Sequence, residues 1–345
     1  MLRVRSTGSA EYNIIESVRN FPIFPLLEIT RSSAFQDFSD RLHKSFGTIM
    51  VDVPRYLLHR NNRYRRDLRA LLGMHQNDPV NFHNSVTSKA DIPVVSLSAR
   101  IVAVQDYTPM VDMINHLAGK FGTIAVRVTV PQSDIRSLAR SNASYSNLLQ
   151  HLPAHSVILF DVPVMTAYEQ VVARNLREMR ARIVSGDHKV YVLNAFGPIA
   201  NGHNFGPYFT LDNGLDGFGD FATEERFPPA SGGRNRATTS IIRYYNYERY
   251  TIEEFRRSSY RDAENDLKAS SVWQRQPSHR TNCRACLEVQ NGNSGGSHSY
   301  WKAFRMIHYV TATMNETRNS CRSAASAQVL DPDGHRAIGT VSPGP

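Results

Sequence analysis

The stretch Ser156–Val164, SVILFDVPV, is a hydrophobic run that ends in one aspartate, Asp161, just before a proline. Three other stretches place a single charged residue at the end of a hydrophobic run: FPLLEI with Glu28, TIMVDV with Asp52 and TIAVRV with Arg127. Short apolar runs of this kind are typical of strands that are buried on both faces, as in a parallel sheet. A charge at the end of each such strand therefore needs an explanation.

Short hydrophobic runs alternate with longer amphipathic stretches along most of the chain. The predicted strands are Phe24–Ile29, Thr48–Val53, Pro93–Leu97, Gly122–Val128, Ser156–Val162, Lys189–Phe196 and Thr239–Tyr244. Between them, SAFQDFSDRLHKSF, YTPMVDMINHLAGKF and MTAYEQVVARNLREMRARI have apolar residues at helical spacing. This alternation predicts βαβ units and a parallel sheet.

A closed (β/α)₈ barrel needs one more strand, and the sequence offers two candidates. Met1–Arg5, MLRVR, would make the residues after about Tyr245 an added lobe, whereas Arg305–Thr313, RMIHYVTAT, would make the chain start a cap. We expect an α/β protein with a TIM-like (β/α)₈ barrel, a long Gly-rich loop over residues 197–236 and a C-terminal appended segment. Residues 1–320 form the predicted barrel domain, with elaborations after residue 197, and residues 321–345 form a flexible tail.

Composition limits the class of protein. Of the 345 residues, 41% are hydrophobic, which suffices for a large core. The sequence has no run of about 18 apolar residues, the length needed to span a bilayer. The start of the chain lacks the apolar region of a signal peptide. Three cysteines are too few for a disulfide framework. We therefore expect a cytoplasmic protein without membrane contact.

The net charge of +9 points to an anionic partner. Arginine is dense in RNNRYRRDLRALL and ARNLREMRARIV, and its planar guanidinium matches phosphate and carboxylate groups. Nucleic acid or a nucleotide is the candidate ligand. The alternative is that these basic helices only present a solvated face.

A barrel accounts for the charged residues at the strand ends, because all parallel strands of a barrel finish at one rim. Barrel enzymes have their active sites at this rim. We expect the following residues to meet there: Glu28, Asp52, Arg127, Asp161, Asn194, Arg243 and Tyr244. The acids would bind Mg²⁺ or act as general acid and base, and the arginines would hold a phosphate or carboxylate. Alternatively, the charges pair with one another and plug the barrel.

Cys283 and Cys286 form a single CxxC motif, which raises the question of zinc. His279 and His298 would be the remaining ligands. No second closely spaced pair accompanies the motif, so zinc is not expected and ordinary packing is predicted, with a redox pair as a further alternative. The P-loop and HExxH motifs are missing from the sequence.

The order of short motifs resembles that of the phage-type beta protein family between Leu2 and Thr313. The motifs are LRVRSTGSAEYNIIESV, FPLLEI, VDV, IPVVSL, TIAVRV, ILFDVP, FGDFA, IIRYY and WKAFRMIHYVT. Members are associated with phages, mobile elements and bacterial defence loci. The resemblance adds these residues to the four charged strand ends: Arg3 or Arg5 with Glu11 near the start, and Asp220, Arg243, Trp301 and His308 near the end. Tyr309 stands where a second histidine is usual.

Together these features predict a defence-type or phage-type barrel protein that binds nucleic acid or a nucleotide at its rim. Metal-assisted phosphodiester hydrolysis, with Mg²⁺, is the candidate reaction. The candidate catalytic residues are Glu28, Asp52, Asp161 and His308. The candidate ligand-binding residues are Arg5, Glu11, Arg127, Asn194, Asp220, Arg243 and Tyr244. The alternative is a non-enzymatic scaffold in a defence complex, with a protein partner from the same operon.

Overall fold

The computed structural model describes most of the predicted core of the chain. The described residues are 2–5, 16–20, 23–29, 35–53, 65–86, 92–97, 108–130, 148–149, 152–162, 170–183, 187–193, 214–221, 239–246, 249, 251–276 and 281–328.

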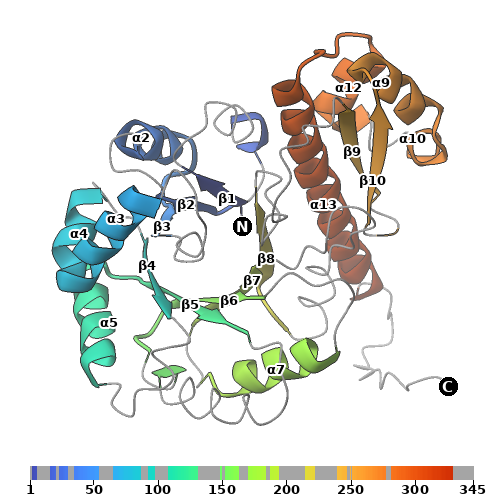
Figure 1. Ribbon diagram of the computed structural model, residues 1–345. Helices are drawn as coiled ribbons and strands as arrows, with labels where there is room; N and C mark the ends of the chain where they lie inside the picture. Colours follow the sequence, from blue (N-terminus) through green and yellow to red (C-terminus); the bar gives the residue numbers. More distant parts are fainter. Residues whose placement is uncertain are drawn as a thin grey trace.

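A curled parallel sheet forms the centre of the molecule (Figure 1). Its strands are β1 (Leu2–Arg5), β2 (Pro25–Glu28), β3 (Met50–Asp52), β4 (Ile92–Leu97), β5 (Ala125–Thr129), β6 (Val157–Asp161), β7 (Lys189–Leu193) and β8 (Gly217–Phe221). Each strand pairs in parallel with the next, and β1 also pairs with β8, which closes the ring. The predicted α/β class is therefore confirmed.

The complete TIM-like (β/α)₈ barrel is a more specific prediction than the α/β class. The pairing of β1 with β8 consists of two residue pairs, Leu2 with Asp220 and Arg3 with Phe221. The connections from β5 to β6 and from β7 to β8 lie mostly outside the described residues. The eightfold repeat of strand and helix thus stays a prediction.

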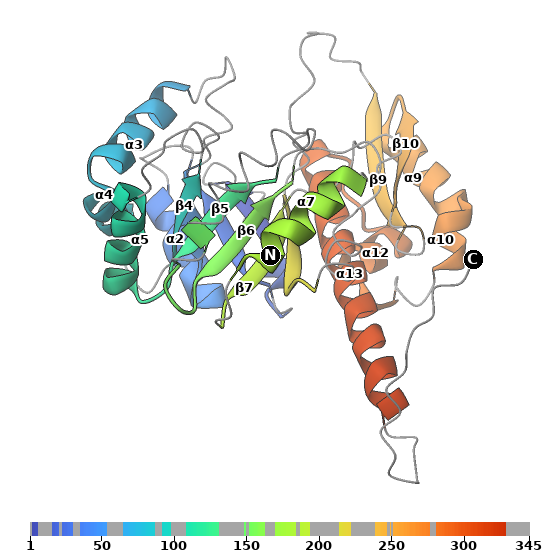
Figure 2. The same cartoon turned by 90° about the horizontal axis from the view of Figure 1, so that it is seen from below.

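Helices pack on the outside of the sheet, as Figures 1 and 2 show. They are α2 (Phe35–Phe46), α3 (Arg65–Asn77), α4 (Pro79–Val86), α5 (Thr108–Phe121) and α7 (Gln170–Ala181). The helical spacing seen in the sequence gives each helix a buried stripe. In α5, for example, Ile114 and Leu117 are buried in one cluster with Val126 of β5 and Ile158 of β6.

Two glycines set the turn from helix to strand. Gly47 follows α2 and Gly122 follows α5, with φ of 77° and 76°, in the left-handed region that favours glycine. Their amides donate to the carbonyls of His43 and Ala118, each at 2.8 Å, which ends the helix with a bond across four residues. The next strand begins within three residues, at Met50 and Ala125 respectively.

The inner face of the sheet has its own apolar cluster. It consists of Leu26, Met50, Ile92, Val94, Ala125, Val157, Leu159 and Leu193, which come from β2 to β7. The alternate residues of the same strands pack outward in clusters that also contain helix residues. Since side chains alternate along a strand, residues two positions after an inner residue also face the interior.

A second lobe follows the sheet in the sequence and lies beside it (Figure 1). It contains the antiparallel strands β9 (Ser240–Asn246) and β10 (Thr251–Arg257) and the helices α9 (Tyr260–Ala269), α10 (Ser271–Arg275), α12 (Arg284–Gln290) and α13 (His298–Gln328). Tyr245 of β9 and Met306 of α13 belong to the same buried cluster as Leu27 of β2 and Val51 of β3. The lobe and the sheet therefore share a hydrophobic core.

The assignment of the last barrel strand was wrong. The predicted strand Thr239–Tyr244 lies in β9, which pairs with β10 in a separate two-stranded sheet. The barrel instead uses β8, within the stretch 197–236 that was predicted to be a loop. Its sequence, GFGDF, has no β-branched residue and so gives no hydrophobic run. Gly217 permits close packing, because a Cβ there would lie 3.3 Å from the Tyr191 ring.

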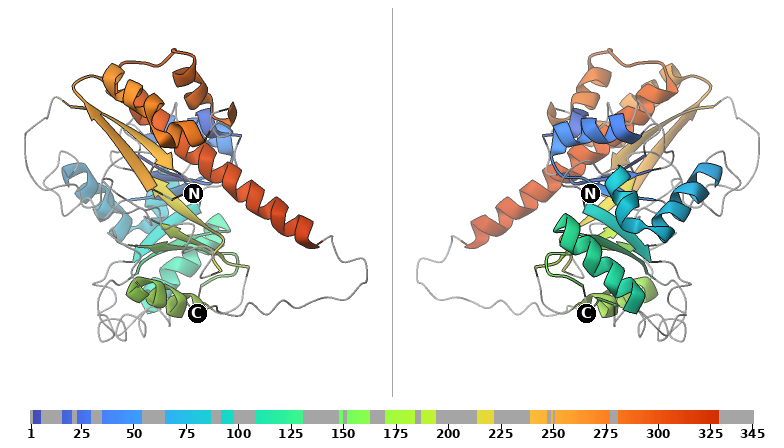
Figure 3. Two further views of the ribbon diagram at one scale, coloured as in Figure 1. Left: turned by 90° about the vertical axis from the view of Figure 1, so that its right-hand side faces the viewer. Right: turned by 90° about the vertical axis from the view of Figure 1, so that its left-hand side faces the viewer.

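Of the two candidates for the extra strand, the chain start is the correct one. Met1–Arg5 supplies β1, whereas Arg305–Thr313 lies inside α13. This helix continues to Gln328, past the expected start of the tail at residue 321, and its C-terminal end extends away from the rest of the described structure (Figure 3). Residues 329–345 lie outside the described residues. Among the described helices, none combines the length and the hydrophobicity that crossing a membrane requires.

Candidate functional site

Four charged side chains form a layer inside the barrel, next to its apolar filling. Each comes two residues after a member of the inner cluster: Glu28 after Leu26, Asp52 after Met50, Arg127 after Ala125 and Asp161 after Leu159. The alternation of side chains therefore turns all four toward the interior. Glu28, Asp52 and Asp161 are the last residues of their strands, so the layer lies at the C-terminal rim.

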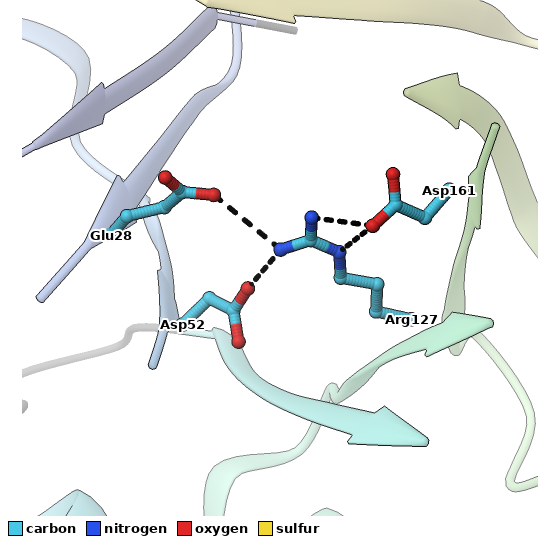
Figure 4. A network of polar contacts seen from close by, with 4 residues as sticks. All are labelled: Glu28, Asp52, Arg127 and Asp161. Carbon is cyan, nitrogen blue, oxygen red and sulfur yellow. Dashed lines mark hydrogen bonds and ion pairs between the residues drawn. The ribbon is translucent and has the colours of Figure 1, made fainter. Parts of the chain in front are cut away.

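Arg127 lies at the centre of this layer, between Asp161 on one side and Glu28 with Asp52 on the other (Figure 4). Its Nε and Nη2 donate to Asp161 Oδ2, at 2.8 and 2.6 Å. Its Nη1 donates to Asp52 Oδ2 at 2.5 Å and contacts Glu28 Oε1 at 3.4 Å. One guanidinium thus joins carboxylates from three different strands. We call these four residues the rim network.

The rim network is buried but becomes more accessible toward Asp161. The side chains of Glu28 and Asp52 are 0% and 1% exposed, and that of Arg127 is 5% exposed, whereas Asp161 is 18% exposed. With all groups ionised, the four residues carry a formal charge of −2. Buried charges are tolerated when they are paired and hydrogen-bonded, which the arginine achieves here. Their convergence is what the charged strand ends predicted.

Chemically, the rim network combines two kinds of group. Carboxylate oxygens are the ligands that Mg²⁺ prefers, and it usually takes one or two of them together with water and phosphate oxygens. The guanidinium can donate two parallel hydrogen bonds to a phosphate group. A layer of this composition is able to hold a cation and a phosphate next to each other.

Two residues predicted for the rim lie elsewhere, because β9 does not belong to the barrel. Arg243 donates from Nε to Glu254 Oε1 of β10 at 2.7 Å. Tyr244 stacks on His308 of α13, with ring centroids 4.0 Å apart. His308, predicted to be catalytic, is buried in the second lobe and is no part of the rim network.

The other predicted residues are only partly described. Arg5 is in register with Glu28, and Asp220 is in register with Leu2. For Arg5 and Asp220 the structure describes the backbone but not the side chain. Glu11 and Asn194 lie outside the described residues.

A cluster of cysteine and histidine side chains in the second lobe was not predicted from the sequence. Cys283, Cys286 and His308 lie together and are buried. A hydrogen bond with the Cys286 side chain lowers the pKa of the Cys283 thiol to about 4, although burial acts in the opposite direction. The signal was the CxxC motif, but its histidine partner comes from α13, which a hydrophobic run had suggested to be a strand. Sequence spacing alone gave no reason to choose His308.

The fold and the rim network define the class as an α/β protein with a parallel barrel sheet and a charged layer at its C-terminal rim. No known protein-family model and no curated protein matches the chain. The resemblance to phage-type beta proteins therefore stays a prediction from the order of motifs.

Proposed function

We propose that the chain is a TIM-type barrel protein that binds a phosphate-bearing ligand, nucleic acid or a nucleotide, at the C-terminal rim and hydrolyses a phosphodiester bond there with the help of Mg²⁺. The observation that carries this proposal is the convergence of three carboxylates from three strands on Arg127. In barrel enzymes the active site lies at this rim.

The charge of the rim network supports a role for a divalent cation. Three carboxylates and one guanidinium sum to −2, which repels a phosphate group, whereas one Mg²⁺ ion brings the sum to zero. Asp161 is the most accessible of the three acids, so a cation and its phosphate ligand would enter from its side. Arg127 would then share its hydrogen bonds between Asp161 and the phosphate.

The reaction follows from these groups. One carboxylate accepts a proton from a water molecule while the water oxygen forms a bond to phosphorus. The bond between phosphorus and the leaving oxygen breaks, and that oxygen takes up the proton that the carboxyl group received from the water. Arg127 would stabilise the charge that builds up on the phosphate oxygens, and a Mg²⁺ ion held by the carboxylates would supply further positive charge there.

The cellular setting that we propose is a phage, mobile-element or bacterial anti-phage defence locus. It is supported by the order of the motifs. The net charge of +9 and the exposed arginines Arg177 of α7 and Arg182, directly after this helix, favour attraction of a nucleic acid.

A second candidate function is a non-enzymatic scaffold of a defence complex. The observation that favours it is that Arg127 donates toward carboxylates on both of its sides, with Glu28 and Asp52 almost fully buried. In that case the rim network holds the barrel together and a protein partner binds elsewhere on the surface.

The test compares two acids of the same barrel. Asp161→Asn changes the rim, whereas Asp216→Asn changes an acid at the opposite end of the strands, where Asp216 accepts a hydrogen bond from the Val190 amide at 2.8 Å. Hydrolysis of bis(p-nitrophenyl) phosphate and of a labelled oligonucleotide is measured with and without MgCl₂. We expect Asp161→Asn to lower the rate by about 10²- to 10⁴-fold, with the control near wild type.

Two outcomes would count against the enzyme. Wild-type protein that neither hydrolyses these substrates nor binds Mg²⁺ in calorimetry would favour the scaffold. Equal activity in Asp161→Asn and wild type would show that the hydrolysis occurs elsewhere or comes from a contaminant.

A further inference from the structure

The core of the second lobe contains a compact set of soft ligand atoms. Cys283 is the N-cap residue of α12, Cys286 lies in its first turn, and His308 lies on α13. The two sulfur atoms and a ring nitrogen all lie within 4.8 Å of one another, and Cys286 Sγ is 3.3 Å from His308 Nδ1. Neither cysteine is in a disulfide bond.

The second nitrogen of His308 fixes the orientation of the ring. Nε2 lies 2.9 Å from the backbone carbonyl oxygen of Tyr245. A carbonyl only accepts hydrogen bonds, so Nε2 must carry the hydrogen, and in the neutral ring Nδ1 has its lone pair directed toward the cysteines. Histidines that bind metals almost always donate their other N–H in this way, often to a backbone carbonyl.

The surroundings hold these three side chains in place. Tyr244 stacks on the His308 ring with a centroid distance of 4.0 Å, and Phe304 stacks at 6.1 Å. Cys283 is 1% exposed, and Cys286 and His308 are 0% exposed. Their positions are therefore set by the folded lobe, as a preorganised metal site requires.

We propose that Cys283, Cys286 and His308 bind a zinc ion that stabilises the second lobe. Zinc with bonds of about 2.3 Å to sulfur and about 2.0 Å to nitrogen holds its ligand atoms roughly 3.5 to 3.8 Å apart in a tetrahedron. The 3.3 Å separation of Cys286 Sγ and His308 Nδ1 is close to this geometry, and the Cys283 sulfur lies within 4.8 Å of both atoms. Two thiolates and an imidazole select zinc over Mg²⁺ or Ca²⁺, which prefer oxygen.

Binding changes the protonation of the ligands in a defined way. Each cysteine binds as a thiolate, so a proton still on its sulfur leaves as the bond to the ion forms, while the neutral imidazole binds through the Nδ1 lone pair. The two thiolates balance the charge of Zn²⁺. No oxidation or reduction takes place.

The ion would join three elements of the lobe. Cys283 and Cys286 come from α12, His308 from α13, and Tyr245, which accepts the hydrogen bond from His308, from β9. The rim network belongs to other elements, so zinc binding and phosphodiester hydrolysis can be tested separately.

From the sequence, zinc was not expected, and the histidines considered as its ligands beside the two cysteines were His279 and His298. His298 Nδ1 instead lies 3.0 Å from the Tyr260 hydroxyl, in an exposed position. His279 lies outside the described residues. Structural zinc is four-coordinate, so one further ligand completes the site.

The experiment measures metal content in the full chain. Protein produced in zinc-supplemented medium is analysed by mass spectrometry of the elements, and we expect about one zinc ion per chain. Cys286→Ser and His308→Gln should lose it. Cys321→Ser is the matched control, because Cys321 is the remaining cysteine of the sequence and its backbone lies 13 residues after His308 in α13, about 20 Å along the helix, and it should keep the zinc.

A second measurement covers variants that do not fold. Wild-type protein is unfolded in the presence of a chelator, which removes bound metal, and is then refolded with Co²⁺. The refolded protein is examined for thiolate-to-cobalt charge-transfer absorption. We expect this absorption, and a melting temperature that falls on chelation and returns with Zn²⁺. Folded wild-type protein that contains no zinc and takes up neither ion would overturn the proposal. So would a folded Cys286→Ser variant with unchanged zinc content.

Discussion

Replacing Arg127 by methionine removes the central cation of the rim network and keeps an unbranched side chain about as long as the aliphatic part of arginine. Its guanidinium contacts Asp161 at 2.6 Å, Asp52 at 2.5 Å and Glu28 at 3.4 Å. Glu28 and Asp52 are almost fully buried, so water cannot replace the lost contact. Breaking a buried pair of this kind costs about 3 to 5 kcal/mol. At about 2 °C per kcal/mol in a large domain, the melting temperature should fall by roughly 6 to 10 °C.

Asp161→Asn should behave differently if the rim network is a functional site. The amide keeps the shape of the side chain and can still accept a hydrogen bond from Arg127, while one of three neighbouring negative charges is removed. Relief of this repulsion offsets the lost ion pair, so the melting temperature should change by no more than about 2 °C. Functional sites are commonly less stable than the fold would allow.

Thermal unfolding followed by circular dichroism, with and without MgCl₂, measures both effects. A cation that binds the native state should raise the melting temperature of the wild type and not that of Asp161→Asn. If both variants are destabilised by a similar large amount and Mg²⁺ has no effect on the wild type, the rim network is structural. The proposed hydrolysis would then have to be abandoned in favour of the scaffold.

Three further predictions concern other parts of the molecule. Binding of an oligonucleotide should weaken linearly with salt on logarithmic axes, because each contacted phosphate releases counterions; salt-independent binding would contradict an electrostatic interface. Burial raises the pKa of Glu254, but hydrogen bonds from Arg243 and Arg256 outweigh it and lower this pKa below its ordinary value. Glu254→Gln should therefore destabilise the protein at neutral pH, and since the stabilising ionised form is lost as pH falls through the lowered pKa, the difference in melting temperature should shrink below about pH 4. Gly217→Ala should destabilise the protein in urea titration by about 1 kcal/mol or more through its contact with Tyr191, whereas the control Gly73→Ala, in a helix with open space around it, should stabilise it by up to about 1 kcal/mol.

Hydrophobic runs identified the strands that contain β-branched residues, such as β5 and β6, and the charge at their ends located the rim network. β8 was not predictable in this way, since its glycines and aromatic residues resemble a loop. The strand character of β9 was recognised, but its partner was not, because an apolar pattern shows that a strand is buried and not which strand lies beside it. Arg243 and Tyr244 were misplaced for that reason.

For α13, the sequence pattern did not distinguish a helix from a strand. The stretch Arg305–Thr313 is rich in β-branched and aromatic residues and is ambiguous between strand and helix when read alone. In the structure it is the middle of a long helix, with buried residues on most of its sides. Once this segment is helical, His308 faces α12 and β9, and the cluster with Cys283 and Cys286 follows. Tertiary packing decided between the two states, and the sequence pattern did not.

The pairing of β1 with β8 has a consequence for the synthesis of the chain. Leu2 leaves the ribosome long before its partner Asp220, which follows only after most of the sheet has been made. At the usual 5 to 20 residues per second, β1 waits roughly 10 to 40 s for this partner. During that time the growing sheet has two open edges, which can pair with strands of other chains. The nascent barrel is therefore most in need of protection by chaperones until Phe221 has emerged.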